Sequence, residues 1–264
     1  MQRLFSQLFL LLQVGCLSLA TMSVSTPVQA ARPEGVPAKL TIGIEDGYFP
    51  YEYLNEKGEF TGFDVELIKY ICKQLETKCK LERGAFDGLI PNLLFKKTDL
   101  VVSALSITDE RKKRVSFSTP YINPIPGVYV VSDNSKYKQV KELKVIGVQQ
   151  GTTLAVYLQQ QKGITIKTYP SFDTAMLDLK TGRIQAVFES EDVAQGYLTA
   201  NKTKAHFLAT KVFSPVVSQG IGIAVRHKDK QLLAAINKAL AKAQSDGVLA
   251  KLKAKYKIVD TFND

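Results

Sequence analysis

The stretch from Leu100 to Arg114 restricts the possible folds of this 264-residue chain more than any other. It starts as an apolar run with Val101 and Val102, which predicts a buried strand, and it ends in a charged segment that predicts the start of a helix. Three hydroxyl side chains fall between the two parts, at Ser103, Ser106 and Thr108. A strand that leads through hydroxyls into a helix is a unit of an α/β sheet.

Arg111 lies in the first turn of that expected helix. Amide donors at a helix start, together with hydroxyls and a guanidinium, can hold a small carboxylate. We therefore interpret the stretch as half of a ligand clamp. An alternative is that Ser106 and Thr108 only cap the helix and that the basic run 111–114 is a solvated face.

The first thirty residues predict a signal peptide, and therefore export to the periplasm. Arg3 supplies the positive start, residues 4–20 are mostly apolar, and Val28-Gln29-Ala30 is a small-residue cleavage site. A lipid anchor at Cys16 is an alternative, but Gln13 stands where a lipoprotein signal has an aliphatic residue.

Removal of residues 1–30 leaves 234 residues, enough for one large domain or two small ones. The formal net charge of the whole chain is +10, but its lysines are scattered and no basic stripe with aromatic residues occurs. The composition therefore predicts no nucleic-acid partner.

After loss of Cys16, the remaining cysteines are Cys72 and Cys79. An even pair in an exported chain predicts one disulfide bond. No histidine is near them in the sequence, since His206 and His227 come much later, so we expect no metal site.

Further candidate site residues follow other expected strands. The strand 40–44 runs into a loop with Glu45 and Tyr48, at the strand end where open α/β sheets place ligands. Phe86 is either a core residue or a face for stacking a flat or cationic group. Thr152 and Thr153 follow the strand 144–148 and either cap a helix or meet an anion.

Two segments predict crossings between lobes. The first runs from 115 through Pro124 and Pro126 into a strand at 127–131, and the second is a glycine-spaced strand at 219–225. The second α/β unit lies between them. Its strand 184–188 ends in the acidic cluster 189–192, which either starts a solvated helix or binds a ligand ammonium group.

The order of these elements resembles the periplasmic solute-binding proteins of polar amino acid ABC importers, over nearly the whole mature chain. The motifs that carry the resemblance are Gly62-Phe63-Asp64, 86–91, 106–111, 150–153 and Gly182-Arg183-Ile184. The resemblance implies the α/β, two-lobed type II (Venus flytrap) fold with two hinge-crossing strands. Lobe 1 would comprise 38–122 plus 219–264, and lobe 2 would comprise 123–218.

The resemblance also implies a ligand site. Arg111 would bind the α-carboxylate with help from Ser106 and the Thr152 region, and Tyr48 and Phe86 would flank the ligand side chain. Glu45 would accept the far end of the ligand. Four further positions would line the same cleft, at Ser103, Ala104, Gln149 and Thr153.

A carboxylate between two aromatic faces suits a guanidinium or ammonium group. The arginine-binding members are the most similar, through Glu45, the 84–87 run and the 148–153 run, while lysine, ornithine and histidine remain open. The α-amino group would meet Ser190 if the alignment follows the strand, or Glu191 if it follows the next helix. We predict that Glu191 supplies the charge, with Ser190 adjacent.

The expected activity is capture of a basic amino acid by hinge closure, followed by docking on an ABC importer permease. We expect a monomer, no cofactor and no enzymatic activity. Two alternatives stay open at this point. A dehydratase of cyclic carboxylates on the same fold would use Glu45 or an acid of the 189–192 cluster as general acid. A sensory module would bind the amino acid without supporting its uptake.

Overall fold

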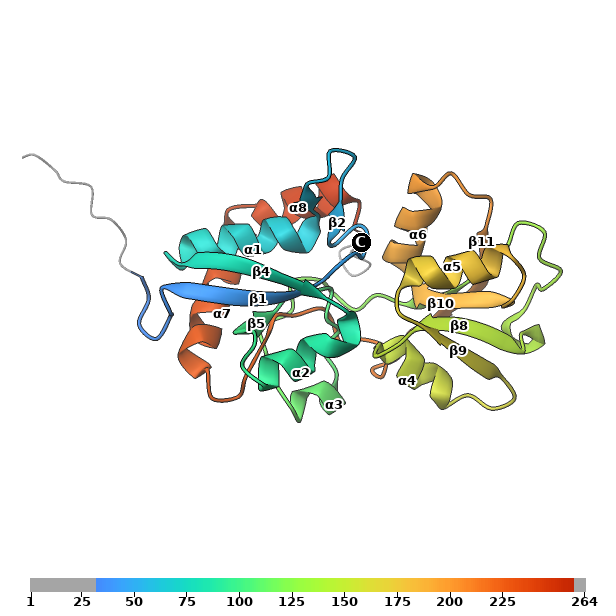
Figure 1. The fold of residues 1–264 in the computed structure, drawn as a ribbon, viewed down its shortest axis with the longest axis horizontal. Helices are drawn as coiled ribbons and strands as arrows, with labels where there is room; N and C mark the ends of the chain where they lie inside the picture. Colours follow the sequence, from blue (N-terminus) through green and yellow to red (C-terminus); the bar gives the residue numbers. More distant parts are fainter. Residues whose placement is uncertain (1–31, 259–264) are drawn as a thin grey trace, which may run out of the picture. The chain divides into compact units, whose positions relative to one another are not determined.

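The computed structural model describes residues 32–258, which form two five-stranded sheets with helices on their faces (Figure 1). The predicted signal peptide, residues 1–30, and Cys16 within it lie outside the described residues. Among residues 32–258, no helix is long and apolar enough to cross a membrane.

The first sheet combines strands from both ends of the described chain. Its strands in spatial order are β4 (Lys78–Gly84), β1 (Lys39–Glu45), β5 (Leu100–Val101), β12 (Ala224–Val225) and β6 (Ser116–Phe117). Strand β1 runs parallel to β4 and β5, while β12 is antiparallel to β5 and β6. The alternation in β1 buries Leu40, Ile42 and Ile44 completely, so this strand anchors the sheet in the core.

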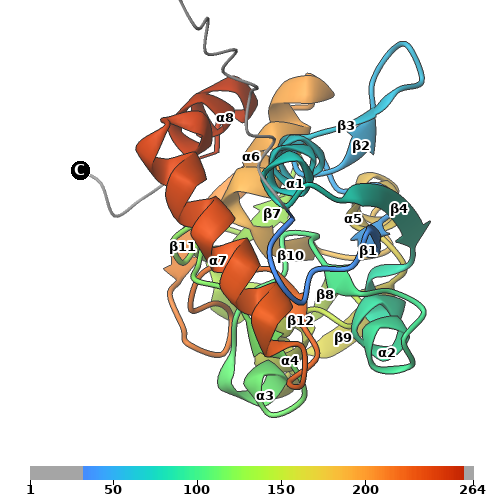
Figure 2. The ribbon, with the colours of Figure 1, turned by 90° about the vertical axis from the view of Figure 1, so that its left-hand side faces the viewer.

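Helices cover both faces of this sheet. Helices α1 (Phe63–Gln74), α7 (Lys230–Ser245) and α8 (Val248–Tyr256) contact one another (Figure 2), and α2 (Leu89–Leu94) packs on β1 and β5. The short helix α3 (Asp109–Lys112) follows β5. Helix α1 starts after Gly62, where an added Cβ atom would lie 2.1 Å from the Tyr51 carbonyl oxygen. This close approach fixes the loop after β1 against α1.

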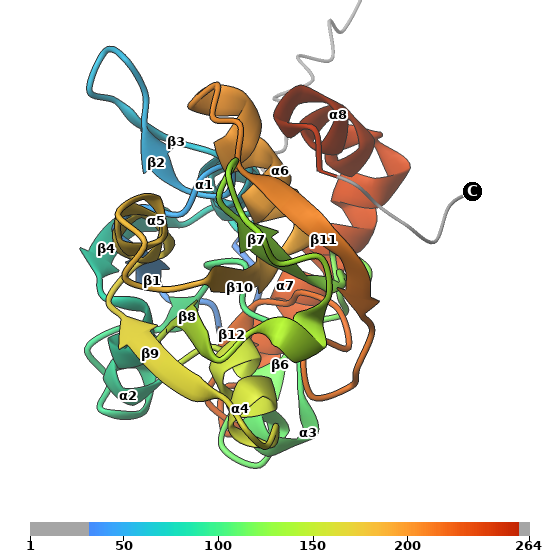
Figure 3. The ribbon, with the colours of Figure 1, turned by 90° about the vertical axis from the view of Figure 1, so that its right-hand side faces the viewer.

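The second sheet has its strands in the order β11 (His206–Val212), β7 (Gly127–Val131), β10 (Ala186–Ser190), β8 (Val145–Gln149) and β9 (Thr165–Tyr169). Helices α5 (Phe172–Lys180) and α6 (Glu191–Ala200) lie on one face, and α4 (Thr153–Gln159) lies on the other (Figure 3). Short elements complete the fold, namely the ribbon β2 (Tyr53–Leu54) and β3 (Phe60–Thr61) and the 3₁₀ turns η1 (Phe86–Gly88) and η2 (Val140–Glu142).

Two segments connect the sheets, residues 118–126 and residues 213–223, in line with the two predicted crossings. They pair with each other where the Ile221 amide donates to the Ile122 carbonyl oxygen at 2.9 Å. The prediction of one continuous strand at 219–225 was wrong, because Gly220 has a φ of 106° and only β12 continues regularly. The predicted lobe boundaries fall within the connecting segments and stay a prediction.

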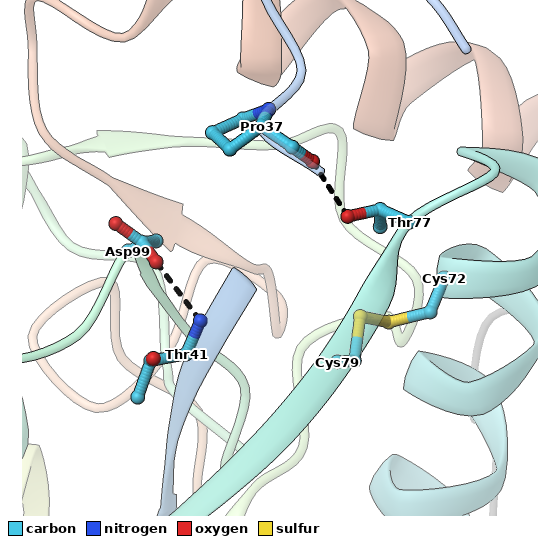
Figure 4. The surroundings of a disulfide bond; sticks show 6 residues. All are labelled: Pro37, Thr41, Cys72, Thr77, Cys79 and Asp99. Carbon is cyan, nitrogen blue, oxygen red and sulfur yellow. Dashed lines mark hydrogen bonds between the residues drawn. A yellow bond between two sulfur atoms is a disulfide. The ribbon is translucent and has the colours of Figure 1, made fainter. Parts of the chain in front are cut away.

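The predicted disulfide bond is confirmed. Cys72, near the end of α1, is bonded to Cys79 in β4, with Cα atoms 6.2 Å apart (Figure 4). Beside it, the Thr77 hydroxyl donates to the Pro37 carbonyl oxygen at 2.6 Å. The bond therefore joins the last turn of the helix to the edge strand of the first sheet, at the end of β4 remote from its carboxyl terminus.

Replacement of both cysteines by serine is expected to lower the free energy of unfolding by about 2 to 3 kcal/mol, the chain-entropy value for a loop this short. Urea denaturation followed by circular dichroism measures the change. The reduced wild-type protein is the matched control and should unfold at the same urea concentration as the Cys72→Ser/Cys79→Ser variant. An unchanged midpoint in both samples would contradict the prediction.

Candidate ligand-binding site

A cavity lies where strand ends of the first sheet face strand ends of the second. Nine of the twelve predicted ligand-binding residues line it: Tyr48, Phe86, Ala104, Ser106, Arg111, Gln149, Thr152, Thr153 and Ser190. Three do not: Glu45, Ser103 and Glu191. Seven residues that sequence reasoning did not select complete the wall: Tyr51, Ile125, Leu154, Asp192, Val217, Ser218 and Ile221.

Arg111 supplies the positive charge of the cavity. Its guanidinium donates to the carbonyl oxygens of Ser106 at 2.8 Å and Gly151 at 3.2 Å, and it lies 5.5 Å from the centre of the Phe86 ring. Burial lowers the pKa of Arg111 to about 10, so the group remains charged at neutral pH. No acidic side chain of the described residues pairs with it.

The two hydroxyl residues before Arg111 have different positions. Thr108 caps α3, because its hydroxyl oxygen accepts a hydrogen bond from the Arg111 amide at 3.3 Å. The alternative interpretation, a helix cap, is therefore right for Thr108. Ser106 instead lines the cavity, so the stretch provides both a cap and a wall residue.

Glu45, at the end of β1, lies behind the cavity wall and is 4% exposed. The Gln149 side-chain amide donates to its Oε1 at 2.5 Å, and its Oε2 is buried without a donor among the described residues. Burial raises the pKa of Glu45 to about 8, the Gln149 hydrogen bond partly offsets this rise, and Glu189 adds to it by repulsion. Because Gln149 comes from β8, this contact joins the two sheets.

Ser103 supports the site from behind. It is fully buried, its hydroxyl oxygen accepts from the Glu45 amide at 3.0 Å, and its hydroxyl donates to Glu52. Asp64 holds the next residue, since its Oδ2 accepts from the Ala104 amide at 2.6 Å. Burial raises the pKa of Asp64 to about 7 and that of Glu52 well above its usual value.

Thr152 and Thr153 begin α4 at the opposite wall. The Thr152 hydroxyl oxygen accepts from the Ala155 amide at 3.2 Å, as in the predicted helix cap, and this hydroxyl donates to the Gln149 carbonyl oxygen at 2.8 Å. The Thr153 hydroxyl donates to the Val217 carbonyl oxygen at 2.6 Å. Both hydroxyls therefore have hydrogen-bond partners within the chain, and these bonds hold the start of α4 in place at the cavity.

The acidic cluster 189–192 differs from the prediction. Glu191 forms an ion pair with Lys211 at 2.6 Å and does not line the cavity, because the first turn of α6 directs it toward β11. Asp192 lines the cavity instead, and sequence reasoning missed it. It is 4% exposed, its Oδ2 accepts from the Tyr51 hydroxyl at 2.5 Å, and its Oδ1 is buried without a described donor. Burial raises its pKa.

Hydrogen bonds between side chains of the two halves narrow the cavity. Tyr48 donates to Glu189 at 2.8 Å, Tyr51 donates to Asp192, and Gln149 donates to Glu45. The cavity volume is about 40 Å³, room for roughly three water molecules. Entry of an amino acid therefore requires these contacts to separate. Among residues 32–258, no group of three or more histidine, cysteine, aspartate or glutamate side chains could hold a metal ion.

The chain matches one protein family over nearly all of its described residues. The family is the bacterial extracellular solute-binding proteins, family 3, and the match covers residues 40–258. One similar protein is the ABC transporter arginine-binding protein 1 of Escherichia coli K12, 38% identical over 81% of this chain and 88% of that protein. Another is the histidine-binding periplasmic protein of Salmonella typhimurium LT2, 34% identical over 86% of this chain and 90% of that protein.

A solved structure supports the same relationship. It is a periplasmic binding protein of Salmonella typhimurium described as highly specific for arginine. It has a TM-score of 0.79 and 32% identity, and the match covers 83% of this chain and 99% of that one. The predicted α/β fold of the type II periplasmic binding proteins is confirmed by this similarity and by the two sheets described above.

The buried acids predict how the stability of the ligand-free protein depends on pH. The pKa values of Glu45, Asp64 and Glu189 are raised to about 8, 7 and 7, respectively, so the folded state binds their protons more tightly than the unfolded state. Their contribution to stability is complete below their unfolded pKa values, near pH 4, and is lost as the pH rises toward about 8. Urea midpoints should therefore fall between about pH 5.5 and about pH 8.5.

The Glu45→Gln variant should show a smaller decrease over the same range, because it lacks one of these titrating groups. Glu56→Gln, which removes an exposed carboxylate, is the control and should follow the wild type. A midpoint that rises with pH would contradict the interpretation of the site as a group of desolvated acids.

Proposed function

The chain belongs to the bacterial extracellular solute-binding proteins of family 3, and within this family we propose that it binds a basic L-amino acid, with L-arginine preferred. The bound amino acid is delivered to the permease of an ABC importer. The proteins it resembles are binding proteins named for arginine and for histidine, and no observation in the site favours the dehydratase alternative.

One observation carries the proposal: a guanidinium without an acidic partner and a desolvated carboxyl group without a basic partner, among the described residues, lie at the same cavity. Among the described residues, Arg111 has carbonyl oxygens and the Phe86 ring as its side-chain partners. Within residues 32–258, the Glu45 carboxyl group has the neutral Gln149 amide as its partner, and its other oxygen is buried without a donor. A ligand with a carboxylate at one end and a cation at the other neutralises both groups, whereas a neutral amino acid leaves Glu45 unpaired.

The geometry supports one orientation of the ligand. The α-carboxylate meets Arg111 and Ser106, and the side chain runs past Tyr48 and Phe86, whose ring faces attract a cation. At the far end, Glu45 supplies a carboxylate and Gln149 an amide oxygen. A planar guanidinium uses both acceptors with its forked donors, whereas the ammonium group of lysine or ornithine acts as a point charge.

For the α-amino group we propose Asp192 in place of Glu191. Asp192 lines the cavity and has a buried oxygen without a described donor, while Glu191 is already neutralised by Lys211. Ser190 also lines the cavity and can accept a second hydrogen bond from the ammonium group. The α-carboxylate and α-amino groups then contact different sheets, so one amino acid bridges both.

This bridging gives the mechanism of closure. A ligand that contacts Arg111 and Glu45 in one lobe and Asp192 at the start of α6 in the other stabilises the form in which the lobes meet, and it shifts the population toward that form. We propose that the closed form docks on the permease as a monomer. The periplasm is the compartment of the similar proteins, and we propose that residues 1–30 direct export to it.

Calorimetry of the mature protein tests the ligand class directly. L-Arginine should bind with a dissociation constant of about 1 µM or below. L-Citrulline, which keeps the shape of arginine but lacks its charge, should bind at least about 100-fold more weakly, because it leaves Glu45 unpaired. The Glu45→Gln variant should lose most of this difference. Absence of binding by any basic amino acid would contradict the proposed function.

A matched pair of variants tests which residue binds the α-amino group of the ligand. Asp192→Asn should weaken arginine binding by about 10- to 100-fold, because the ammonium group loses its counter-charge. Glu191→Gln removes the same charge one residue away and should change the affinity by less than about twofold. The reverse ranking of the two variants would restore the prediction made from the sequence.

A further inference from the structure

Glu189 is a fully buried acid that the proposed binding mode does not use. We propose that Glu189 is a specificity-determining residue that acts through Tyr48: its carboxylate, held against the Tyr48 hydroxyl, adds a second negative charge behind the wall that faces the ligand side chain. This inference rests on the proposed function and extends it, because it explains why that wall selects a cationic side chain.

The position of Glu189 follows from the second sheet. It precedes the last residue of β10 and pairs with Val128 of β7, which places it in the interior of the sheet. Its Oε1 accepts hydrogen bonds from the Tyr48 hydroxyl at 2.8 Å and from the Ser190 amide at 2.7 Å. Its Oε2 is buried and has no donor among the described residues. The carboxylate is therefore fixed behind Tyr48 and does not reach the cavity itself.

The groups that act most strongly on Glu189 and Glu45 are acids and neutral hydrogen-bond partners. Burial raises the pKa of Glu189, and Asp192, three residues later on α6, adds to this rise by repulsion, while Glu189 in turn raises the pKa of Glu45 on β1. Asp173 on α5 and Asp46 after β1 also act on Glu45. Lys211 on β11 is engaged by Glu191, and no basic side chain of the described residues pairs with Glu189. At the end of the cavity that receives the ligand side chain, Glu45 and, behind Tyr48, Glu189 are therefore the nearby acids.

Tyr48 transmits this charge to the cavity. Burial and the nearby Glu189 raise the pKa of Tyr48 well above its usual value, so the phenol keeps its proton and remains a hydrogen-bond donor. A phenol that donates to a carboxylate has more electron density in its ring, and the ring lines the cavity. Both effects favour a cation on the cavity side of the ring. A neutral side chain of the same shape gains nothing from them.

A purely structural role makes a different prediction. The Tyr48–Glu189 hydrogen bond joins a loop of the first sheet to a strand of the second, so it could simply hold the lobes together. In that case its loss would weaken arginine and citrulline binding equally. The ratio of the two affinities distinguishes selection of charge from support of closure.

The experiment measures arginine and citrulline binding by calorimetry in three proteins: wild type, Glu189→Gln and Glu191→Gln. The glutamine at 189 keeps an oxygen that can accept from Tyr48 but removes the charge. We expect arginine affinity to fall by about 10-fold in Glu189→Gln with citrulline changed by less than about twofold. Glu191→Gln, in which the lost charge is paired with Lys211, should leave the arginine-to-citrulline ratio at the wild-type value.

A second measurement counts the protons that the protein releases when arginine binds. In the ligand-free protein the pKa values of Glu45 and Glu189 are raised to about 8 and about 7, so both groups are partly protonated near neutral pH. A ligand cation displaces these protons and leaves both groups charged, so arginine affinity should rise from about pH 6 to about pH 8.5. Arginine titrations in two buffers of different ionisation enthalpy count the protons released, and Glu189→Gln should release fewer than the wild type. Tyr48→Phe should make the effect of Glu189→Gln on arginine smaller, because the link to the ring is gone.

The outcomes separate the two proposals. If the wild-type protein binds no basic amino acid, the proposed function fails and this inference fails with it. If the wild type binds arginine but Glu189→Gln keeps the wild-type arginine-to-citrulline ratio, only the inference about Glu189 is overturned. Equal weakening of both ligands also overturns it, and assigns Glu189 to closure alone.

Discussion

The site depends on desolvated negative charge that the chain itself does not neutralise. Five carboxylates near the cavity or directly behind it are buried with one oxygen lacking a donor among the described residues: Glu45, Glu52, Asp64, Glu189 and Asp192. Arg111 lines the same cavity, but it binds carbonyl oxygens and no acid. Buried acids without a counter-ion take up protons or attract a cation. A preference for basic ligands therefore follows from the surroundings of the cavity as much as from any single contact.

The buried acids have two different roles, and their hydrogen-bond partners show which acid has which role. Glu52 and Asp64 hold the backbone after β5, through Ser103 and the Ala104 amide, and Ala104 has the uncommon positive φ of 41°. These two acids therefore fix the loop that carries one wall of the cavity. Glu45, Glu189 and Asp192 instead accept from side chains that come from the opposite sheet, so their charge is shared between the two halves of the site.

Much of this was accessible from the sequence, because the relevant signals are local. The expected strand at 40–44 and the hydroxyl-rich stretch before Arg111 both depend on neighbouring residues, and both led to the right element. Cys72 and Cys79 were paired from their number and the expected export. The motif order then placed Tyr48, Phe86 and Gln149 at one cavity, which no single motif could do.

The differences between the sequence prediction and the structure concern where side chains point after a strand ends. Within the run 189–192 three carboxylates compete, and only the start of α6 at Glu191 decides that Glu191 turns toward Lys211 and Asp192 toward the cavity. Glu45 was predicted at the ligand because it follows a strand and Ser103 because of the family resemblance, and the structure has both directly behind the wall, where Gln149 and Glu52 hold them. The return crossing was read as a strand because the positive φ of Gly220 leaves no trace in the apolar pattern. Each of these features is set by a partner distant in sequence.

The distribution of the acids links ligand choice to closure. Glu45 comes from the first sheet, whereas Glu189 and Asp192 come from the second, so approach of the two halves brings like charges together in a medium of low dielectric constant. Repulsion therefore opposes closure around an empty or neutral interior unless the acids are protonated. A ligand cation between the acids makes the electrostatic contribution to closure favourable. Closure and selectivity then have one physical cause, since the ligand that best neutralises the interior is also the one that best holds the two halves together.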